Sequence, residues 1–270
     1  MNNKNSNWVK LTLITCGITY VALVIFIPAV NVFYQAFKGG LGNFFNYLLT
    51  EECLLAVQLT VLIALIVVPI NTIFGLCAAW VIARHKFPGR TMLVSILDLP
   101  FSVSPVVAGL MMVLLYGRHG WLGGVLEAIN FKVIFALPGM ILVTAFVTMP
   151  FVAREVIPVL EEVGSDQEEA AKTLGANEWE TFLRVTLPNI RWGLLYGVIL
   201  TNARAMGEFG AVSVVSGNII RKTQTLSLFV EASYKQYEPQ AAFAAAVLLA
   251  CLGFVTLLIK EVVEHSTQRT

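Results

Sequence analysis

The sequence predicts an all-α, polytopic membrane protein with six transmembrane helices. Hydrophobic residues make up 57% of its 270 positions and charged residues only 13%, whereas a soluble domain carries about a quarter charged residues. Six apolar runs each approach the ~20 helical residues that cross ~30 Å of hydrocarbon. One strongly polar segment, residues 165–188, interrupts them. The net charge of +1 argues against nucleic-acid binding, which needs concentrated Lys and Arg.

The expected spans follow one another through polar connections. Their ranges are residues 11–33, 54–83, 91–116, 133–151, 192–215 and 241–263. Pro69 should kink the second span, because a proline inside a helix removes a backbone hydrogen bond. This order gives an N-terminal part (1–53: a cytoplasmic segment, the first span and an external loop), a transmembrane core (54–263) with a polar loop at 154–191, and a cytoplasmic tail (264–270).

The distribution of basic residues predicts which ends of the spans face the cytoplasm. Of the 18 Lys and Arg residues, eleven fall on the side of both termini and of the 165–188 segment. Six fall on the other side, and Arg204 lies within a span. The richer side is cytoplasmic by the positive-inside rule. We therefore expect a multi-pass inner-membrane protein with both termini and the polar segment in the cytoplasm.

The reactive side chains predict no catalytic, metal or cofactor site. The cysteines and histidines are scattered and lack the spacing of metal or redox centres. No Gly-x-x-x-x-Gly-Lys-Ser/Thr phosphate loop is present, so the chain should not bind ATP itself. These features are typical of a transport subunit that is not an enzyme and draws energy from another subunit or an ion gradient. The residues are Cys16, Cys53, Cys77, Cys251, His85, His119 and His265.

The polar segment should fold into two short helices joined at one glycine. Ser165 is expected to cap the first helix, with Glu168 as its partner in a capping box. Gly175 should end that helix in a left-handed conformation. Asn177 should cap the second helix with Glu180 as its reciprocal partner. Such a compact unit, apolar on one side and charged on the other, predicts a docking surface or, more simply, a linker between spans.

Arg204 lies about twelve residues into the fifth span, near the middle of the membrane. An arginine there costs at least ~2.5–3.5 kcal/mol on insertion scales, so it should face a partner or a wet cavity. Glu208 follows one helical turn later and can pair with it. The two residues either act as a gate in the pathway or form a buried pair that only fixes helix packing. A continuous helix would place small and polar residues on one face: Gly197, Thr201, Arg204, Glu208 and Ala211.

The third span contains two prolines, Pro100 and Pro105, which should break it in mid-membrane. A broken helix at that depth is tolerated mainly where it lines a cavity. Ser102, Ser104 and the freed N–H groups could serve an anion there, and Asp98 could pair with a cation. The simpler alternative is a kinked helix whose serines bond to their own backbone.

Several of these stretches resemble known transporters. Glu169-Ala170-Ala171, followed by Gly175 and by residues 185–188 (Val-Thr-Leu-Pro), resembles the EAA loop of ABC importer permeases. Residues 100–109 and 203–211 resemble the sulfate and molybdate branch of that family. Residues 216–226 are similar to the CysW-type sulfate permeases in particular.

The resemblance implies the architecture of a type I ABC importer permease, whose loop is the coupling helix. Two such chains, this one and a homologous partner, would form the pathway in the lipid bilayer. Two cytoplasmic ATPase subunits would dock on their loops, and a periplasmic binding protein would deliver sulfate, with thiosulfate as a second candidate. The ATPase-coupling residues would be Glu168, Glu169, Ala170, Ala171, Gly175, Ala176, Leu187 and Pro188.

Other functions stay open at this level. Molybdate and tungstate are also small dianions, and nothing in the residues ranks them against sulfate. A transporter or channel that works alone on an ion gradient would explain Arg204 and Glu208, yet it leaves the 165–188 unit without a role and expects an internal repeat that we do not find. A membrane-embedded enzyme would need acidic residues or histidines clustered at a membrane face, and these are absent from the sequence.

Overall fold

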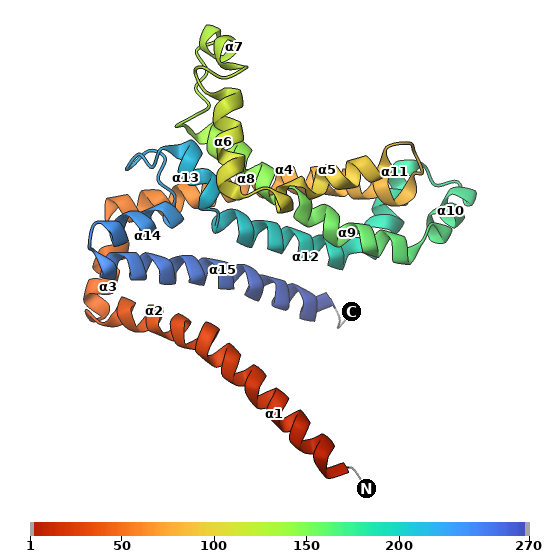
Figure 1. The fold of residues 1–270 in the computed structure, drawn as a ribbon. Helices are drawn as coiled ribbons and strands as arrows, with labels where there is room; N and C mark the ends of the chain where they lie inside the picture. The colour runs from red at the N-terminus through yellow and green to blue at the C-terminus, as the bar shows by residue number, and fades with distance from the viewer. Residues whose placement is uncertain (1–2, 268–270) are drawn as a thin grey trace.

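Long helices lie side by side in the computed structural model, which describes residues 3–267, and all regular structure among these residues is helical (Figure 1). The N-terminal half contains α1 (Asn3–Val21), the π-helix η1 (Ala22–Phe26), α2 (Ile27–Phe37), α3 (Leu41–Leu48), α4 (Glu51–Arg84), α5 (Arg90–Ser102), α6 (Pro105–Tyr116) and α7 (Gly123–Ala128). The C-terminal half contains α8 (Leu137–Thr148), α9 (Pro150–Val163), α10 (Asp166–Thr173), α11 (Glu178–Thr181), the π-helix η2 (Phe182–Thr186), α12 (Leu187–Met206), α13 (Gly210–Ser216), α14 (Leu226–Lys235) and α15 (Pro239–Thr267).

The centre of the bundle is α9, which packs between α4 and α12. Val152 of α9 is fully buried. A Cβ atom added at Gly75 of α4 would lie 2.7 Å from the Val152 Cβ, and one at Gly197 of α12 would lie 2.9 Å from the Val152 Cα. The absence of a side chain at both glycines therefore lets three helices approach within backbone contact at one level.

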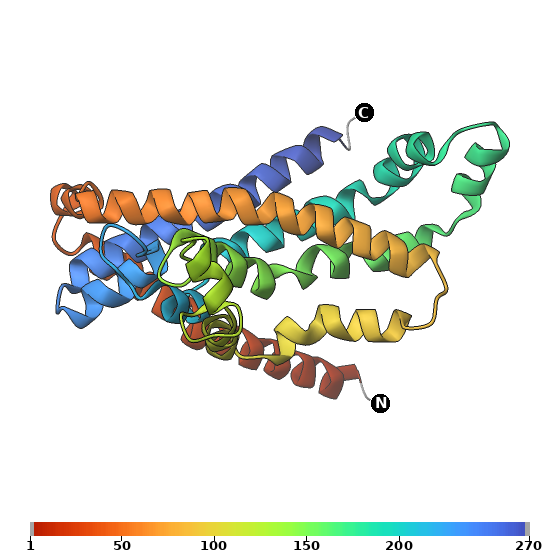
Figure 2. The same ribbon diagram turned by 90° about the horizontal axis from the view of Figure 1, so that it is seen from above.

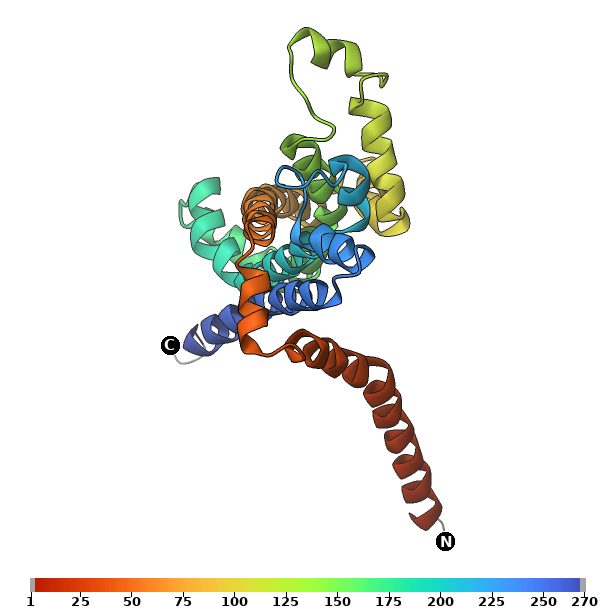
Figure 3. The ribbon, with the colours of Figure 1, turned by 90° about the vertical axis from the view of Figure 1, so that its left-hand side faces the viewer.

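The first expected span is a long helix that leaves the bundle. Lys10–Phe37 is apolar and long enough to cross a membrane, and its most apolar stretch of 18 residues has no residue buried inside the chain, although Ala36 near its end is buried. A π-helical turn, η1, interrupts its regular winding, and α1 then extends away from the other helices (Figure 3). Most of this helix therefore presents its surface to lipid or to another subunit, and only its C-terminal end packs on the bundle.

The third expected span is broken, as the two prolines predicted, but the break is sharper than a kink. Helices α5 and α6 meet at an angle of 108°. Pro105 is the first residue of α6, where its missing N–H costs no hydrogen bond. Pro100 lies inside α5 and does not end it. The chain turns sharply at Val103–Ser104 and carries α6 and α7 sideways out of the bundle (Figure 1).

Two expected boundaries were wrong. The fourth span does not end at residue 151, because α8 and α9 run on from Leu137 to Val163, so residues 154–163 of the expected polar loop are helical. The fifth span is not one helix, because α12 ends at Met206 and α13 begins at Gly210. The face expected to carry Thr201, Arg204 and Glu208 on one helix is therefore interrupted.

Four helices among the described residues are long and apolar enough to cross a membrane, or five if α5 and α6 count as one span. The sequence predicted six, so that count is not confirmed. The missing span is the fifth, since α12 carries Arg191, Asn202 and Arg204 and is followed by a break rather than by further apolar turns.

The arrangement places several segments at one end of the bundle. The start of α1, the end of α15 and the helix α10 all lie toward the same end, whereas α3 and α14 lie at the other (Figures 1 and 2). This is the grouping that the distribution of basic residues predicted for the cytoplasmic side.

Candidate functional site: the α10–α11 unit and the buried charges

The polar segment forms a projecting unit at the end of α9 (Figure 2). Gly164, at φ +69°, turns the chain out of α9, and α10 follows. Gly175, at φ +93°, ends α10 as predicted. Its N–H donates to the Lys172 carbonyl at 3.0 Å, and the Ala176 N–H donates to the Ala171 carbonyl at 3.1 Å. This pair of bonds is a Schellman motif, which satisfies two carbonyls at the helix end.

The second short helix begins with the predicted capping box. The Asn177 side chain accepts from the Glu180 N–H at 2.9 Å, and the Glu180 carboxylate accepts from the Asn177 N–H at 3.1 Å. Trp179 then stacks on Phe182, with ring centroids 5.9 Å apart. Local sequence therefore determines the shape of this half of the unit.

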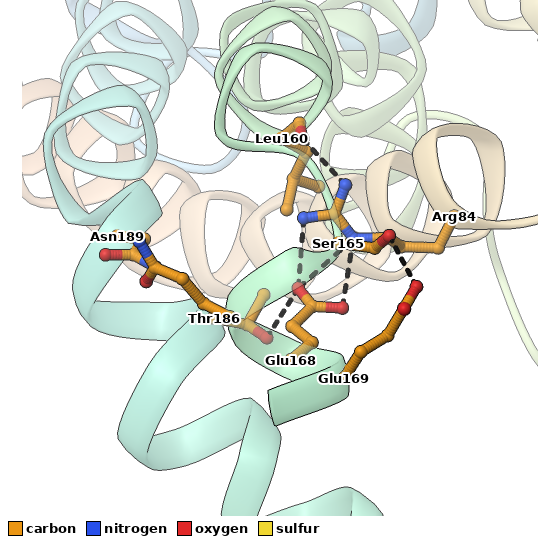
Figure 4. Close-up of polar contacts among 8 residues, drawn as sticks. Arg84, Leu160, Ser165, Glu168, Glu169, Thr186 and Asn189 are labelled. Atoms are coloured by element: carbon orange, nitrogen blue, oxygen red, sulfur yellow. Dashed lines mark hydrogen bonds and ion pairs between the residues drawn. The ribbon is translucent and has the colours of Figure 1, made fainter. Parts of the chain in front are cut away.

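The capping box predicted at Ser165 was wrong. The Ser165 hydroxyl donates to the Glu169 carboxylate at 2.8 Å instead of capping the backbone. Glu168 points the other way, toward Arg84 at the end of α4 (Figure 4). A charged partner 84 positions away in sequence offers a stronger, charge-assisted bond than the local backbone N–H does.

Arg84 holds Glu168 by three hydrogen bonds (Figure 4). Its Nε lies 3.1 Å from each carboxylate oxygen, and its Nη2 lies 3.0 Å from Oε1. The third guanidinium nitrogen, Nη1, donates to the Leu160 carbonyl at 2.7 Å, which is one of the last four carbonyls of α9. The Thr186 hydroxyl also donates to Glu168, at 2.9 Å. One buried carboxylate thus joins α10 to α4, to η2 and, through the guanidinium, to α9.

The remaining residues of the expected coupling set divide into an exposed and a half-buried group. Ala170, Glu169, Gly175 and Pro188 are exposed, whereas Ala171, Ala176 and Leu187 are half-buried. Large apolar side chains add to the exposed surface: Leu174 is 89% and Trp179 is 68% accessible. Lys172 and Glu178 bridge the two short helices at 2.8 Å, and this hydrogen bond raises the pKa of Lys172.

The expected pair in the fifth span is present. The Arg204 Nη1 lies 2.6 Å from the Glu208 carboxylate, and the Glu208 side chain is 1% exposed while that of Arg204 is 33% exposed. The other Glu208 oxygen accepts from the Ala211 N–H at 2.9 Å. Glu208 therefore joins the end of α12 to the start of α13 across the break.

The breaks of the third and fifth spans lie against each other. A Cβ atom at Gly210 would lie 3.0 Å from Pro105, and one at Gly109 would lie 2.8 Å from the Ala211 carbonyl. Thr201 is fully buried, and its hydroxyl donates to the Gly197 carbonyl of its own helix at 2.7 Å. The structure thus brings Pro105 close to the segment that contains Glu208.

The other residues expected in the pathway precede Pro105, in α5 and at the bend. Asp98 pairs with Arg154 of α9 at 2.7 Å, and the same guanidinium lies 5.2 Å from the Phe101 ring. Ser102 and Ser104 are exposed at the bend. The sequence reasoning missed Arg84, Thr186 and Arg154; for Arg84 the available signal was a basic residue ending a long span beside an excess of acidic residues in 165–188.

Among the described residues, no group of three or more His, Cys, Asp or Glu side chains could hold a metal ion.

Comparisons with known proteins converge on one family. Residues 71–269 match the family model described as the binding-protein-dependent transport system inner membrane component. The chain is 61% identical, over 96% of its length, to the sulfate transport system permease protein CysW of Synechocystis sp., of which it covers 94%. It is 37% identical, over 87% of its length, to the sulfate transport system permease protein CysT of Escherichia coli, of which it covers 85%.

Solved structures share the fold at low identity. A bacterial ABC transporter involved in the import of the acidic polysaccharide alginate aligns with a TM-score of 0.82 at 17% identity, covering 98% of this chain and 96% of that one. A bacterial alginate ABC transporter in complex with an alginate pentasaccharide-bound periplasmic protein aligns with a TM-score of 0.79, also at 17% identity, covering 95% and 93%. At this identity the likeness concerns the fold alone.

Proposed function

The chain belongs to the family of binding-protein-dependent transport system inner membrane components, and from that premise we propose that it is the sulfate-conducting permease subunit of an ATP-driven importer. Two relatives, at 61% and 50% identity, are named sulfate transport system permease proteins, and the chain covers 94% and 89% of their length. Its fold is that of ABC importer permeases. The chain contributes the membrane pathway, and the ATP chemistry resides in a separate subunit.

The single observation that supports coupling to that subunit is the exposed α10–α11 unit. Leu174 and Trp179 expose large apolar surfaces in an otherwise polar segment, and exposed apolar surfaces rimmed by charge mark interaction sites. Glu169 and Ala170 lie on the exposed side of α10. We assign the ATPase contact to this surface, and a complex would contain two ATPases, one on each permease chain.

The remaining partners follow from the relatives. A CysT protein of the same family is a separate permease at 37% identity, so the second permease chain is a homologue of this one. An alginate importer of the same fold binds a periplasmic protein that carries its substrate, and a periplasmic sulfate-binding protein would serve this chain in the same way. Both termini and the α10–α11 unit would then lie in the cytoplasm.

We place the ion route along the contact between the two broken spans. The pair Arg204–Glu208 lies at this contact with Pro105 beside it. A cation held by a buried carboxylate can attract a dianion without retaining it, and conduction requires such weak binding. Arg204 would act as a gate, whereas Asp98, Ser102 and Ser104 would line the route only if the bend faces it.

The experiment is uptake of radiolabelled sulfate by the reconstituted complex of permease pair, ATPase and binding protein. Sulfate uptake that requires ATP and the binding protein would support the proposal. Unlabelled thiosulfate, molybdate and tungstate compete in separate arms and rank the dianions. Uptake by the chain alone, driven by an ion gradient, would overturn it.

A further inference from the structure

The cluster of side chains around Glu168 supports an inference about how a movement of the α10–α11 unit reaches the long helices. This inference rests on the proposed coupling to an ATPase. Helix α10 is flanked by two glycines with positive φ, Gly164 and Gly175. Neither residue opposes rotation of the backbone as a residue with a side chain would. A force on α10 would therefore bend the chain at these two points unless something else holds the helix to the bundle.

Arg84 and Glu168 supply that hold. Their side chains are only 10% and 12% exposed, and the guanidinium forms a bidentate contact that fixes direction as well as distance. We propose that Arg84 is a positioning residue that locks α10 to the ends of α4 and α9. Displacement of the α10–α11 unit then moves the long helices instead of bending the chain at Gly164 and Gly175.

The geometry favours transmission over simple anchoring. Glu168 also accepts from Thr186 of η2, which continues directly into α12. Asn189 of α12 donates to Gln167 of α10 at 2.7 Å and adds a second tether (Figure 4 shows Asn189 beside Thr186). The helices reached by these contacts, α4, α9 and α12, are the three that pack together at Val152. A displacement of α10 thus acts on the ends of all three central helices through one cluster of contacts.

This arrangement also separates the two neighbouring glutamates by role. Glu168 is buried and committed within the chain, so it is not available to an ATPase. Glu169 is exposed, with Ser165 as its partner inside the chain. The expected coupling residues therefore divide into a contact residue, Glu169, and a residue that transmits force, Glu168.

The test compares variants of Arg84 in the reconstituted complex, using stimulation of ATP hydrolysis by the sulfate-loaded binding protein as the readout. Arg84→Met keeps the length of the side chain and removes the lock. We expect assembly with the ATPase to persist and stimulation to fall at least about fivefold, the low end of coupling between two sites. Stimulation equal to that of the unchanged complex would overturn the inference.

A matched control, Arg90 at the start of α5, lies close to Arg84 at the end of α4 in the sequence. Arg90 pairs with Glu161 at 2.7 Å and donates to the Ile82 carbonyl, but both charged side chains are nearly half-exposed and neither touches α10. Arg90→Met should leave stimulation unchanged. An equal loss in this variant would show that any arginine at the bundle end has the same effect, and would overturn the assignment to Arg84.

A double variant distinguishes force transmission from simple stability. Replacing a buried ion pair by apolar side chains of similar volume is often neutral for stability, whereas removing one partner leaves an unpaired buried charge. Arg84→Met with Glu168→Met should therefore recover the thermal midpoint lost in Arg84→Met and stay poorly stimulated. Recovery of stimulation along with stability would overturn the inference, since the pair would then serve folding alone.

A measurement without substrate or ATPase keeps this test independent of the proposed function. Spin labels at Lys86→Cys and Thr173→Cys, both exposed positions, report the distance between the end of α4 and the end of α10 in the full-length chain. The native cysteines are replaced by alanine: Cys16, Cys53, Cys77 and Cys251. We expect a narrow distribution of distances between the two labels that broadens with Arg84→Met, and an unchanged distribution would refute the lock. Failed sulfate uptake by the unaltered complex would refute only the proposed function.

Discussion

The packing at Val152 makes a quantitative prediction about the centre of the bundle. In Gly75→Ala the new Cβ would lie 2.7 Å from the Val152 Cβ and 3.1 Å from the Ala153 backbone nitrogen. Val152 cannot retreat, because the opposite side of α9 already meets Gly197 at the Val152 Cα. Overpacking of this kind costs about 1–3 kcal/mol, and alanine regains about 1 kcal/mol through its helix propensity. The net loss of stability is about 0–2 kcal/mol.

The control removes the propensity contribution. Gly17 lies in α1 with nothing within 4 Å of its ideal Cβ, so Gly17→Ala gains propensity without a clash. The difference between the two variants equals the contact cost of about 1–3 kcal/mol, and each kcal/mol shifts the thermal midpoint by roughly 2–4 °C. Thermal unfolding of both variants in the same detergent measures it. A Gly75→Ala midpoint at or above that of Gly17→Ala would refute the close packing of α4 on α9.

Three further predictions concern the coupling surface and the pathway. Gly175→Ala places a side chain at φ +93°, which costs about 1–2 kcal/mol, and should weaken co-purification of the ATPase. Gly175→Asn should have a milder effect, because asparagine tolerates this conformation better. Equal amounts of ATPase retained by the two variants would contradict this. Leu174→Ser should leave stability within about 0.5 kcal/mol, whereas Trp179→Ser should cost about 0.5–1.5 kcal/mol because it removes the stacking on Phe182. Each should lower ATPase affinity roughly thirtyfold, as for a residue contributing ~2 kcal/mol at an interface. Titration of labelled ATPase measures this, and unchanged affinity argues for another docking surface. Arg204→Ala should slow sulfate uptake at least about tenfold, a barrier change of ~1.4 kcal/mol, while the complex still assembles; uptake at the original rate would reduce the Arg204–Glu208 pair to packing.

Local signals predicted the features that depend on neighbouring residues. The Asn177–Glu180 capping box and the left-handed Gly175 each need only a few adjacent positions, and both are present. The contact of Arg204 with Glu208 likewise follows from their spacing of four residues. These features lie within the reach of pattern reasoning because their partners are fixed by the chain itself.

Features set by packing escaped that reasoning. Ser165 and Glu168 have the spacing of a capping box, but Arg84 takes the carboxylate once α4 and α10 meet. The end of α12 at Met206 was also missed, although a glycine on each side of Glu208, at 207 and 210, was a sign that an apolar run would not stay helical. At Glu168 a contact between distant segments outweighed a local preference, whereas at Met206 the local glycine signal was overlooked.

The sharp bend between α5 and α6 has a consequence for how the protein enters the membrane during synthesis. The two helices have 13 and 12 residues, which at ~1.5 Å per residue reach only ~20 Å and ~18 Å of a ~30 Å hydrocarbon layer. Neither can settle as an independent segment, and the polar backbone at the bend needs protein around it. The bend lies against Gly210 and Ala211, so this region acquires its final environment only after most of the chain, through the start of α13, has been translated.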